Sequence, residues 1–302
     1  FPVRKSKAQK QEFRAAVKSY AEELGYTVTE EKGAFGARNL ILGDPENAIF
    51  LVTAHYDTCS RMLVPNFITP CNVPVYLLYQ LGIVFGFAIA AIAIGLAAGL
   101  LLGSAAVKMV SFNAYCLLAL IMILGPANKT NANDNTSGTV TLVEIALSLP
   151  EELREDVCFV WFDNEERGLL GSSAFAGKHK GAKKGALVIN FDCVSDGDSL
   201  QFFPTKQAKK DGTANLLRQS FLPAGEKSVE VVDGFGFYPS DQAAFRRGVG
   251  VCALKKSKFF GWYMDRIHTR RDTVLDEQNI DLLRAGAVRL VKSVVKKEEA
   301  HV

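Results

Sequence analysis

The feature that most constrains the fold is a long uncharged segment in the first half of the chain. From Met62 to Asn128 the only charged residue is Lys108. Within it, residues 73–103 form an apolar run longer than the roughly 20 residues that a helix needs to cross a bilayer, and residues 109–125 form a shorter one. Soluble domains rarely bury so long an uncharged run. We therefore predict that residues 62–128 form an inserted hydrophobic helical hairpin that spans the membrane and contacts its lipid through residues 73–125.

 The alternative is a buried helical pair, or a hydrophobic cap over the rest of the protein.

The two remaining pieces, residues 1–61 and 129–302, are predicted to form one domain. Short apolar runs typical of buried strands alternate along them with patterns typical of helices. The buried strands are expected at residues 48–55, 157–162, 186–191 and 250–254, and two short strand-like pieces at residues 26–31 and 38–42. The main helices are expected at residues 6–24, 137–149, 168–178 and 276–297, with a helix-like segment at residues 241–247. Strands that alternate with helices indicate an α/β domain in which helices cover both faces of a mostly parallel sheet.

Composition excludes some classes of partner and environment. The net charge of +3 over 302 residues gives no strong attraction to nucleic acid, so no nucleic-acid partner is expected.

We interpret the basic residues near the N-terminus as a solvated helix face. These residues are Arg4, Lys5, Lys7, Lys10, Arg14 and Lys18. The chain begins at Phe1 and not at Met, which is consistent with the removal of an upstream segment.

The side of the membrane is predicted from two weak signals. Arg61 and Lys129 flank the hairpin, whereas Lys108 alone marks its tip, and this favours a cytoplasmic domain by the positive-inside tendency. The six cysteines show no CxxC spacing and suggest no disulfide framework. Their pattern is typical of a reducing compartment.

Side chains of the types that bind metals, histidine and carboxylate, stand at the ends of three of the expected strands. The first strand ends at His55, the second is followed by Glu165 and Glu166, and the third by Asp192. Ligands bind at the carboxyl ends of strands in open α/β sheets, so these side chains are expected to meet. Adjacent carboxylates at the end of an apolar strand need a cation or a shared proton. The sequence therefore predicts a metal site, in which a pair of zinc ions would supply the positive charge that the adjacent carboxylates need.

The four histidines narrow the ligand set. Two of them lie in the C-terminal tail and in a lysine-flanked turn, which leaves His55 and His268. Asp57 is close enough to His55 to orient its ring, and Asp272 is expected to do the same for His268. Two zinc ions with one bridging carboxylate require five protein ligands, a number that these two histidines and three carboxylates would meet. The predicted metal ligands are His55, Asp134, Glu166, Asp192 and His268.

At this point the chain resembles a known family, the co-catalytic di-zinc aminopeptidases, whose relatives include glutamate carboxypeptidase-like enzymes and glutaminyl cyclases. Six short segments carry the resemblance and stand in the family's order. They are Ala54–Asp57, Asn133–Gly138, Asp163–Ser172, Asn190–Asp192, Ser240–Asp241 and Ile267–Thr269. The departure from the family is the long interval between His55 and Asp134, which is much shorter in soluble relatives. The resemblance implies the three-layer zinc-exopeptidase fold, here with the inserted hairpin.

The resemblance also implies a role for each residue. Asp134 would bridge two Zn²⁺ ions, His55 and Asp192 would complete one site, and Glu166 and His268 would complete the other. Glu165 would stay off the metal as the general base that activates a metal-bridging water, with Asp57 as the second catalytic residue. A cis peptide bond is implied after Asp134. The implied activity is that of a zinc-dependent exopeptidase, an aminopeptidase, acting on peptides with a free N-terminus.

Other assignments stay open from the sequence alone. One is a glutaminyl cyclase-like acyltransferase with a single zinc, against which the complete ligand set argues. Another is a non-catalytic membrane receptor or scaffold, which loss of Glu165 or of a ligand would mark, and none is lost. Tyr238, in a glycine-rich stretch, is either a donor to the oxyanion or a packing aromatic.

Overall fold

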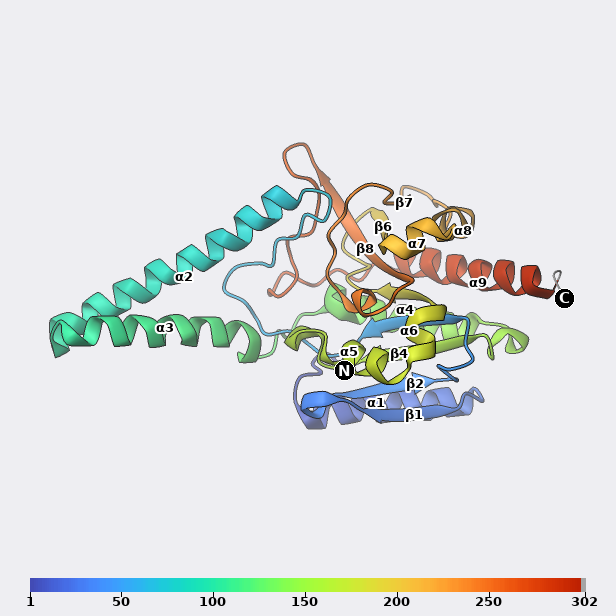
Figure 1. The fold of residues 1–302 in the computed structure, drawn as a ribbon, viewed down its shortest axis with the longest axis horizontal. Coiled ribbons are helices and arrows are strands. Elements are labelled where there is room, and N and C mark those ends of the chain that lie inside the picture. Colours follow the sequence, from blue (N-terminus) through green and yellow to red (C-terminus); the bar gives the residue numbers. More distant parts are fainter. Residues whose placement is uncertain (300–302) are drawn as a thin grey trace.

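The computed structural model describes residues 1–299 and contains one nine-stranded mixed sheet (Figure 1). In spatial order the strands are β1 (Val28–Lys32), β2 (Arg38–Leu42), β4 (Val157–Phe162), β3 (Phe50–His55), β5 (Leu187–Phe191), β8 (Gly248–Ser257), β6 (Ser199–Pro204) and β7 (Ser228–Val231), and β9 (Gly261–Tyr263) pairs with β8. The central strands β4, β3, β5 and β8 are parallel. β1, β2, β6 and β9 each pair antiparallel with a neighbour, so the sheet is mixed.

Helices cover both faces of the sheet because its central strands are apolar on both sides. The larger core cluster joins one face to α1 (Lys7–Glu23), α4 (Gly138–Ser148), α8 (Thr213–Ser220) and α9 (Glu277–Glu299). The other face packs on α5 (Leu170–Lys178) and α6 (Lys180–Gly185). Along β4, Phe159 and Trp161 belong to the first cluster, whereas Cys158 and Val160 belong to the second. This alternation follows from the period of a strand, and the predicted three-layer α/β fold is confirmed.

Several short elements lie outside the sequence prediction. Strands β6, β7 and β9 and the helices α7 (Lys206–Lys210) and α8 follow the third predicted strand or the fourth. β7 is an edge strand whose residues are partly or fully exposed, so it lacks the apolar run by which the buried strands were identified.

The uncharged segment forms two long helices that project from the domain (Figure 1). These are α2 (Val73–Leu102) and α3 (Ala105–Leu124), and both are long and apolar enough to cross a membrane. α2 ends and α3 begins around Gly103, and the two helices diverge towards the domain (Figure 1). Only 11% of the most apolar stretch of α2 is buried, and none of the corresponding stretch of α3 is buried. A buried helical pair is therefore not what the structure contains.

Three of the six basic N-terminal residues are buried, so the interpretation of the whole set as a solvated helix face is wrong, although Lys7 is exposed. Arg4, Lys10 and Arg14 are 2%, 7% and 4% exposed. Arg4 Nε donates to the backbone carbonyl of Tyr56, and Arg14 donates to the hydroxyl of the same residue. Their partners lie far along the chain, which is why helical periodicity alone did not identify them.

Candidate metal centre

The parallel register brings the three polar strand ends to one edge of the sheet. His55 at the end of β3 pairs with Phe162 at the end of β4, and Thr53 pairs with Asn190 on β5. The turn after β4 and the residue after β5 therefore lie on either side of His55, as expected for the carboxyl ends of parallel strands.

The first half of the centre contains His55, Asp134 and Asp192. The Nε2 atom of His55 lies 3.3 Å from Oδ1 of Asp134 and 3.4 Å from Oδ1 of Asp192. Its other ring nitrogen, Nδ1, lies 3.5 Å from Oδ1 of Asp57. That Asp57 oxygen also accepts a 3.0 Å hydrogen bond from the backbone amide of Glu165. Asp57 thus contacts both the His55 ring and the turn that holds Glu165.

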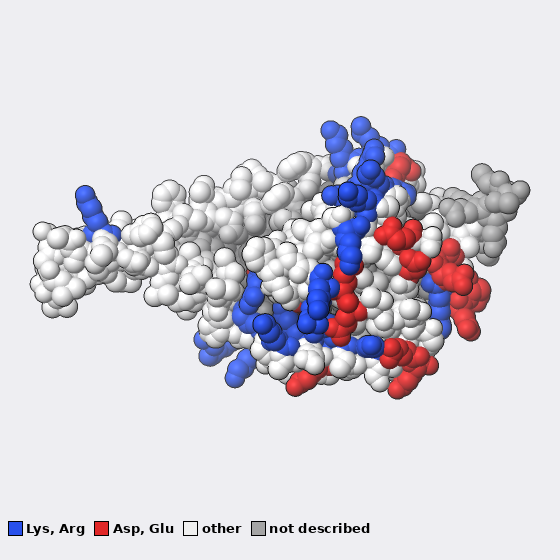
Figure 2. All heavy atoms as spheres, turned by 60° about the horizontal axis from the view of Figure 1, so that its bottom comes forward, with Lys and Arg blue, Asp and Glu red and all other residues white. Residues whose placement is uncertain are grey.

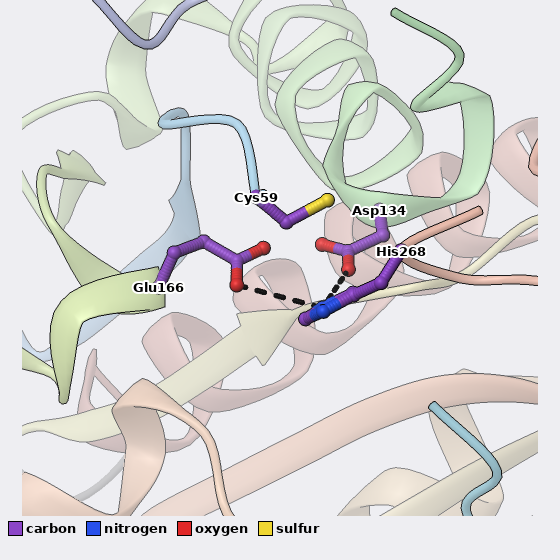
Figure 3. Close-up of side chains that lie close together, drawn as sticks. All are labelled: Cys59, Asp134, Glu166 and His268. Atoms are coloured by element: carbon purple, nitrogen blue, oxygen red, sulfur yellow. Dashed lines mark ion pairs between the residues drawn. The ribbon is translucent and has the colours of Figure 1, made fainter. Parts of the chain in front are cut away.

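The second half contains Asp134 again, with Glu166 and His268 (Figure 3). The Nε2 atom of His268 lies 2.9 Å from Oδ2 of Asp134 and 3.4 Å from Oε2 of Glu166. Asp134 therefore directs one carboxylate oxygen to each half. The structure brings together all five predicted ligands, whose roles remain predictions.

The donor set fits zinc. Imidazole nitrogen and carboxylate oxygen bind zinc at about 2.0–2.2 Å, so two such donors in a tetrahedral site lie roughly 3.3–3.6 Å apart. The separations of 3.3 and 3.4 Å in the first half, and of 3.4 Å in the second, agree with this, whereas the 2.9 Å between His268 Nε2 and Asp134 Oδ2 is a hydrogen-bond distance that a bound ion would lengthen. The Oε1 atom of Glu166 is also buried without a hydrogen-bond partner, which a cation would supply.

Electrostatics at the centre reflect an excess of negative charge. Burial raises the pKa of Glu165 well above its ordinary value; His55 opposes this rise, while Glu166 adds to it. Burial and the Asp134 carboxylate likewise raise the pKa of Glu166. Burial disfavours the charged form of His55, but Glu165 and the hydrogen bond to Asp134 raise its pKa above the ordinary value. A cluster of this kind is stabilised by a cation.

Backbone and side-chain contacts hold Asp134 in place. The peptide bond between Asp134 and Asn135 is cis, as the resemblance implied. Asn135 Nδ2 donates to the carbonyls of His55 and Phe191, at the ends of two strands. Asp272 accepts hydrogen bonds from the backbone amides of Asn133, at 2.7 Å, and of Asp134, at 3.0 Å. Asp272 therefore supports the loop of Asp134, and the expectation that it orients the His268 ring is not what these contacts show.

Exposure indicates the side from which the centre is reached. The side chains of His55 and Asp134 are 1% and 4% exposed, whereas those of Glu166 and His268 are 11% and 16% exposed. The side chain of Asp192 is 10% exposed, so the open side is that of Asp192, Glu166 and His268. The loop carrying His268 lies there beside the start of the hairpin, because the Met62 amide donates to the His268 carbonyl at 2.8 Å.

Other residues have contacts that the sequence did not reveal. Cys59, four positions after His55, lies with Asp134, Glu166 and His268 in the second half of the centre. No metal-type spacing marks it. The hydroxyl of Tyr238 donates to the carbonyl of Asp192 at 2.9 Å, so this side chain supports the backbone next to the centre.

Comparisons with known proteins agree with the fold. The model of peptidase family M28 matches residues 119–291, more than half of the chain. The structure resembles the LapA aminopeptidase of Legionella pneumophila, at 15% identity and a TM-score of 0.58, over 96% of this chain and 65% of that chain. It also resembles the glutaminyl cyclase of Macrostomum lignano, at 15% identity and a TM-score of 0.51, over 98% of this chain and 84% of that chain.

These likenesses define what is established. At such identities the solved structures show the fold, and the chain spans about two thirds of the length of LapA. None of the curated proteins compared with it matches the sequence. The family match includes the regions of Asp134, Glu166, Asp192 and His268. The chain belongs to peptidase family M28.

Proposed function

We propose that the protein is a zinc-dependent aminopeptidase with two zinc ions, in which Glu165 is the general base. Members of family M28 are zinc-dependent peptidases, which supports the reaction class. The observation that carries the proposal is the position of Asp134, whose two oxygens face separate groups of donors. A carboxylate placed in this way suits a bridging ligand between two ions.

The proposed ligands divide between two ions. His55 and Asp192 would hold one ion with Oδ1 of Asp134, and Glu166 and His268 would hold the other with Oδ2. When bound, zinc acts as a Lewis acid towards the scissile carbonyl and lowers the pKa of water. Asp57 lies 3.5 Å from Nδ1 of His55, from where it would orient the ring so that Nε2 faces the first ion.

Glu165 is placed to move the proton. Its carboxylate forms a group with His55 and Glu166 in which the donor atoms lie within 4.8 Å of one another. The hydrogen bond from its backbone amide to Asp57 fixes the turn. We propose that Glu165 takes a proton from the attacking water and delivers it to the nitrogen of the leaving amine.

The choice of an aminopeptidase rests on charge and on the open side of the centre. A free α-amine is cationic, and the centre presents the carboxylates of Asp57, Asp134, Glu165, Glu166 and Asp192. Two zinc ions would offset four of these five negative charges, so one net negative charge would remain to attract the N-terminus of a peptide that enters past Glu166 and His268. An N-terminally blocked peptide would lack the attraction.

The test is a panel of aminoacyl, blocked and carboxypeptidase substrates with added zinc. We expect hydrolysis of substrates with a free N-terminus and little hydrolysis of their blocked counterparts. Two zinc ions per active chain are expected. Activity with one zinc per chain, together with cyclisation of N-terminal glutamine, would favour the glutaminyl cyclase alternative. Binding without any turnover would favour the non-catalytic scaffold.

Replacement of Glu165 tests its role separately. We expect Glu165→Gln to retain both zinc ions and to lower kcat by about 10²–10⁴, the usual contribution of a general base. Glu166→Gln is the matched neighbour and should lose zinc from the second half of the centre. Zinc content and kcat measured on the same preparations separate these effects. Unchanged turnover in Glu165→Gln would refute the assignment.

We also propose that residues 62–128 are an inserted membrane hairpin, with residues 1–61 and 129–302 as the peptidase domain. The two apolar helices support this by length and composition. Figure 2 shows Lys and Arg gathered on the part of the domain nearer the hairpin and Asp and Glu farther away. Basic groups beside a bilayer attract anionic lipid. The proposed orientation places the domain in the cytoplasm.

Flotation with vesicles tests the membrane proposal. We expect the full chain to float with vesicles and to resist extraction by high salt, because the apolar helices are held by the hydrophobic effect. Release by salt would contradict insertion. Protease treatment of sealed vesicles or cells then reports the side on which the domain lies.

A further inference from the structure

Cys59 occupies a position in the centre that none of the proposed ligand roles uses. Its side chain is fully buried. Its Sγ atom belongs to a group with donor atoms of Asp134, Glu166 and His268, all within 4.8 Å of one another. Figure 3 shows the thiol facing the space that these three side chains enclose. The thiol therefore completes a group of four metal-type donors.

A second observation at the same place points to a ligand. The Oε1 atom of Glu166 is buried without a hydrogen-bond partner. Asp134 and His268 are already 2.9 Å apart through Oδ2 and Nε2, and Glu166 Oε2 lies 3.4 Å from the same His268 nitrogen. One donor atom from each of Asp134, Glu166 and His268, together with the Cys59 sulfur, makes the four ligands that tetrahedral zinc takes.

We propose that Cys59 is a direct ligand of the ion in the second half of the centre, together with Asp134, Glu166 and His268. This inference rests on the metal site proposed above. The thiol gives its proton to solvent as the metal–sulfur bond forms, as cysteine ligands do. The expected zinc–sulfur distance is about 2.3 Å.

A sulfur ligand makes the two halves chemically unequal. The first half has one nitrogen and two oxygens from His55, Asp134 and Asp192, and so keeps a position for water or substrate. The second half is filled by four protein donors and resembles a closed structural site. Thiolate also favours soft metals, so Cd²⁺ should bind the second half in preference to the first.

Cobalt substitution of the full-length protein in detergent tests the proposal. Wild-type protein loaded with Co²⁺ should show a sulfur-to-cobalt charge-transfer band in the near ultraviolet. Cys59→Ser should lose this band and should lose at least about tenfold in Cd²⁺ affinity, because even an outer-shell partner contributes 10–100-fold to metal affinity. Its affinity for Zn²⁺ should fall less.

Cys193→Ser is the matched control. This second buried thiol lies 3.2 Å from Oδ1 of Asp192, beside the first half of the centre, but outside the group that contains Cys59. We expect Cys193→Ser to keep the band. A band that disappears in Cys193→Ser and persists in Cys59→Ser would overturn the proposal.

X-ray absorption of the zinc-loaded wild-type protein needs no variant and so does not depend on the folding of Cys59→Ser. A sulfur shell at about 2.3 Å supports the proposal. Two bound zinc ions with only nitrogen and oxygen neighbours would refute the role of Cys59 and leave the proposed function standing. Failure of the wild-type protein to bind zinc or cobalt would instead overturn the metal site itself.

Discussion

At the scale of single residues, the candidate centre depends on side chains that hold its donors in place. Asp272 uses both carboxylate oxygens to accept hydrogen bonds from consecutive backbone amides, those of Asn133 and Asp134. These bonds fix the backbone from which the Asp134 carboxylate extends. Outer contacts of this kind orient metal ligands before the metal binds.

Asp272→Ala should therefore weaken zinc binding. Both amides would lose their acceptor, and we expect zinc affinity to fall about 10–100-fold. Competition with a chromophoric chelator measures the change. Thr273→Ala, at the exposed neighbouring position, is the control and should leave affinity unchanged. Equal affinities in the two variants would contradict the positioning role.

Lys10 has a structural role that its place in a basic stretch concealed. Its Nζ atom donates to Oδ1 of Asp163 at 2.5 Å and to Oδ1 of Asn164 at 2.7 Å, and Asp163 is 2% exposed. Lys10→Met would leave that carboxylate buried without a cationic partner, with the backbone amide of Arg38 still donating to it. We expect a loss of about 3–5 kcal/mol in the free energy of unfolding. Denaturant titration checks this, and Lys7→Met, at an exposed position, should unfold like the wild type.

At the scale of elements, two of the glycines in α2 allow the two helices of the hairpin to pack closely against each other. A Cβ atom on Gly95 would lie 1.9 Å from Ser111 Oγ, and one on Gly99 would lie 2.5 Å from Val107. Gly82 and Gly86 have no such neighbour, because α2 and α3 have diverged there (Figure 1). Close approach of the helices is confined to the half near the turn, where small residues allow it.

Gly95→Leu should separate the two helices, whereas Gly82→Leu should not. We expect Gly95→Leu to lower the free energy of unfolding by about 1–3 kcal/mol, because the larger side chain overpacks the contact between α2 and α3. The midpoint of thermal unfolding in detergent is the measurement. Similar midpoints for the two variants would show that the observed helix contact contributes little.

At the scale of the whole molecule, the base of the hairpin is connected to the candidate centre. The segment before α2 pairs with the His268 loop, through the amides of Met62 and Asn66, which donate to the carbonyls of His268 and Ile267. The segment after α3 contacts the same loop, because Asn128 Nδ2 donates to the carbonyl of Thr269 at 2.9 Å. The hairpin base thus supports one proposed ligand from both sides.

Two deletions of different length distinguish the role of the hairpin helices from that of the segments that connect them to the domain. Replacement of residues 73–124 by a flexible glycine–serine linker should remove membrane binding and leave zinc content unchanged. Deletion of all of residues 62–128 should also lower zinc content, because the contacts to the His268 loop are lost. Flotation and zinc analysis measure the two effects. Equal zinc content in both deletions would contradict the link between the base and the centre.

The sequence by itself determined the features that depend on residue type and local period. Apolar runs located the central strands, and the parallel connection of β3, β4 and β5 placed His55, the Glu165–Glu166 turn and Asp192 at one edge. The uncharged segment likewise determined two long helices. Edge strand β7 was not predicted, since half-exposed short strands carry a weak pattern.

Only the tertiary structure decided which distant side chains meet. Cys59 lies beside Asp134 and Glu166, although no motif links it to them. Lys10 pairs with Asp163, and Asp272 supports Asp134 in place of His268. Such contacts join segments separated by long stretches of chain, and their energies depend on burial and geometry that no local pattern encodes. The donors of the candidate centre were therefore visible in the sequence, whereas the side chains that support and extend it were not.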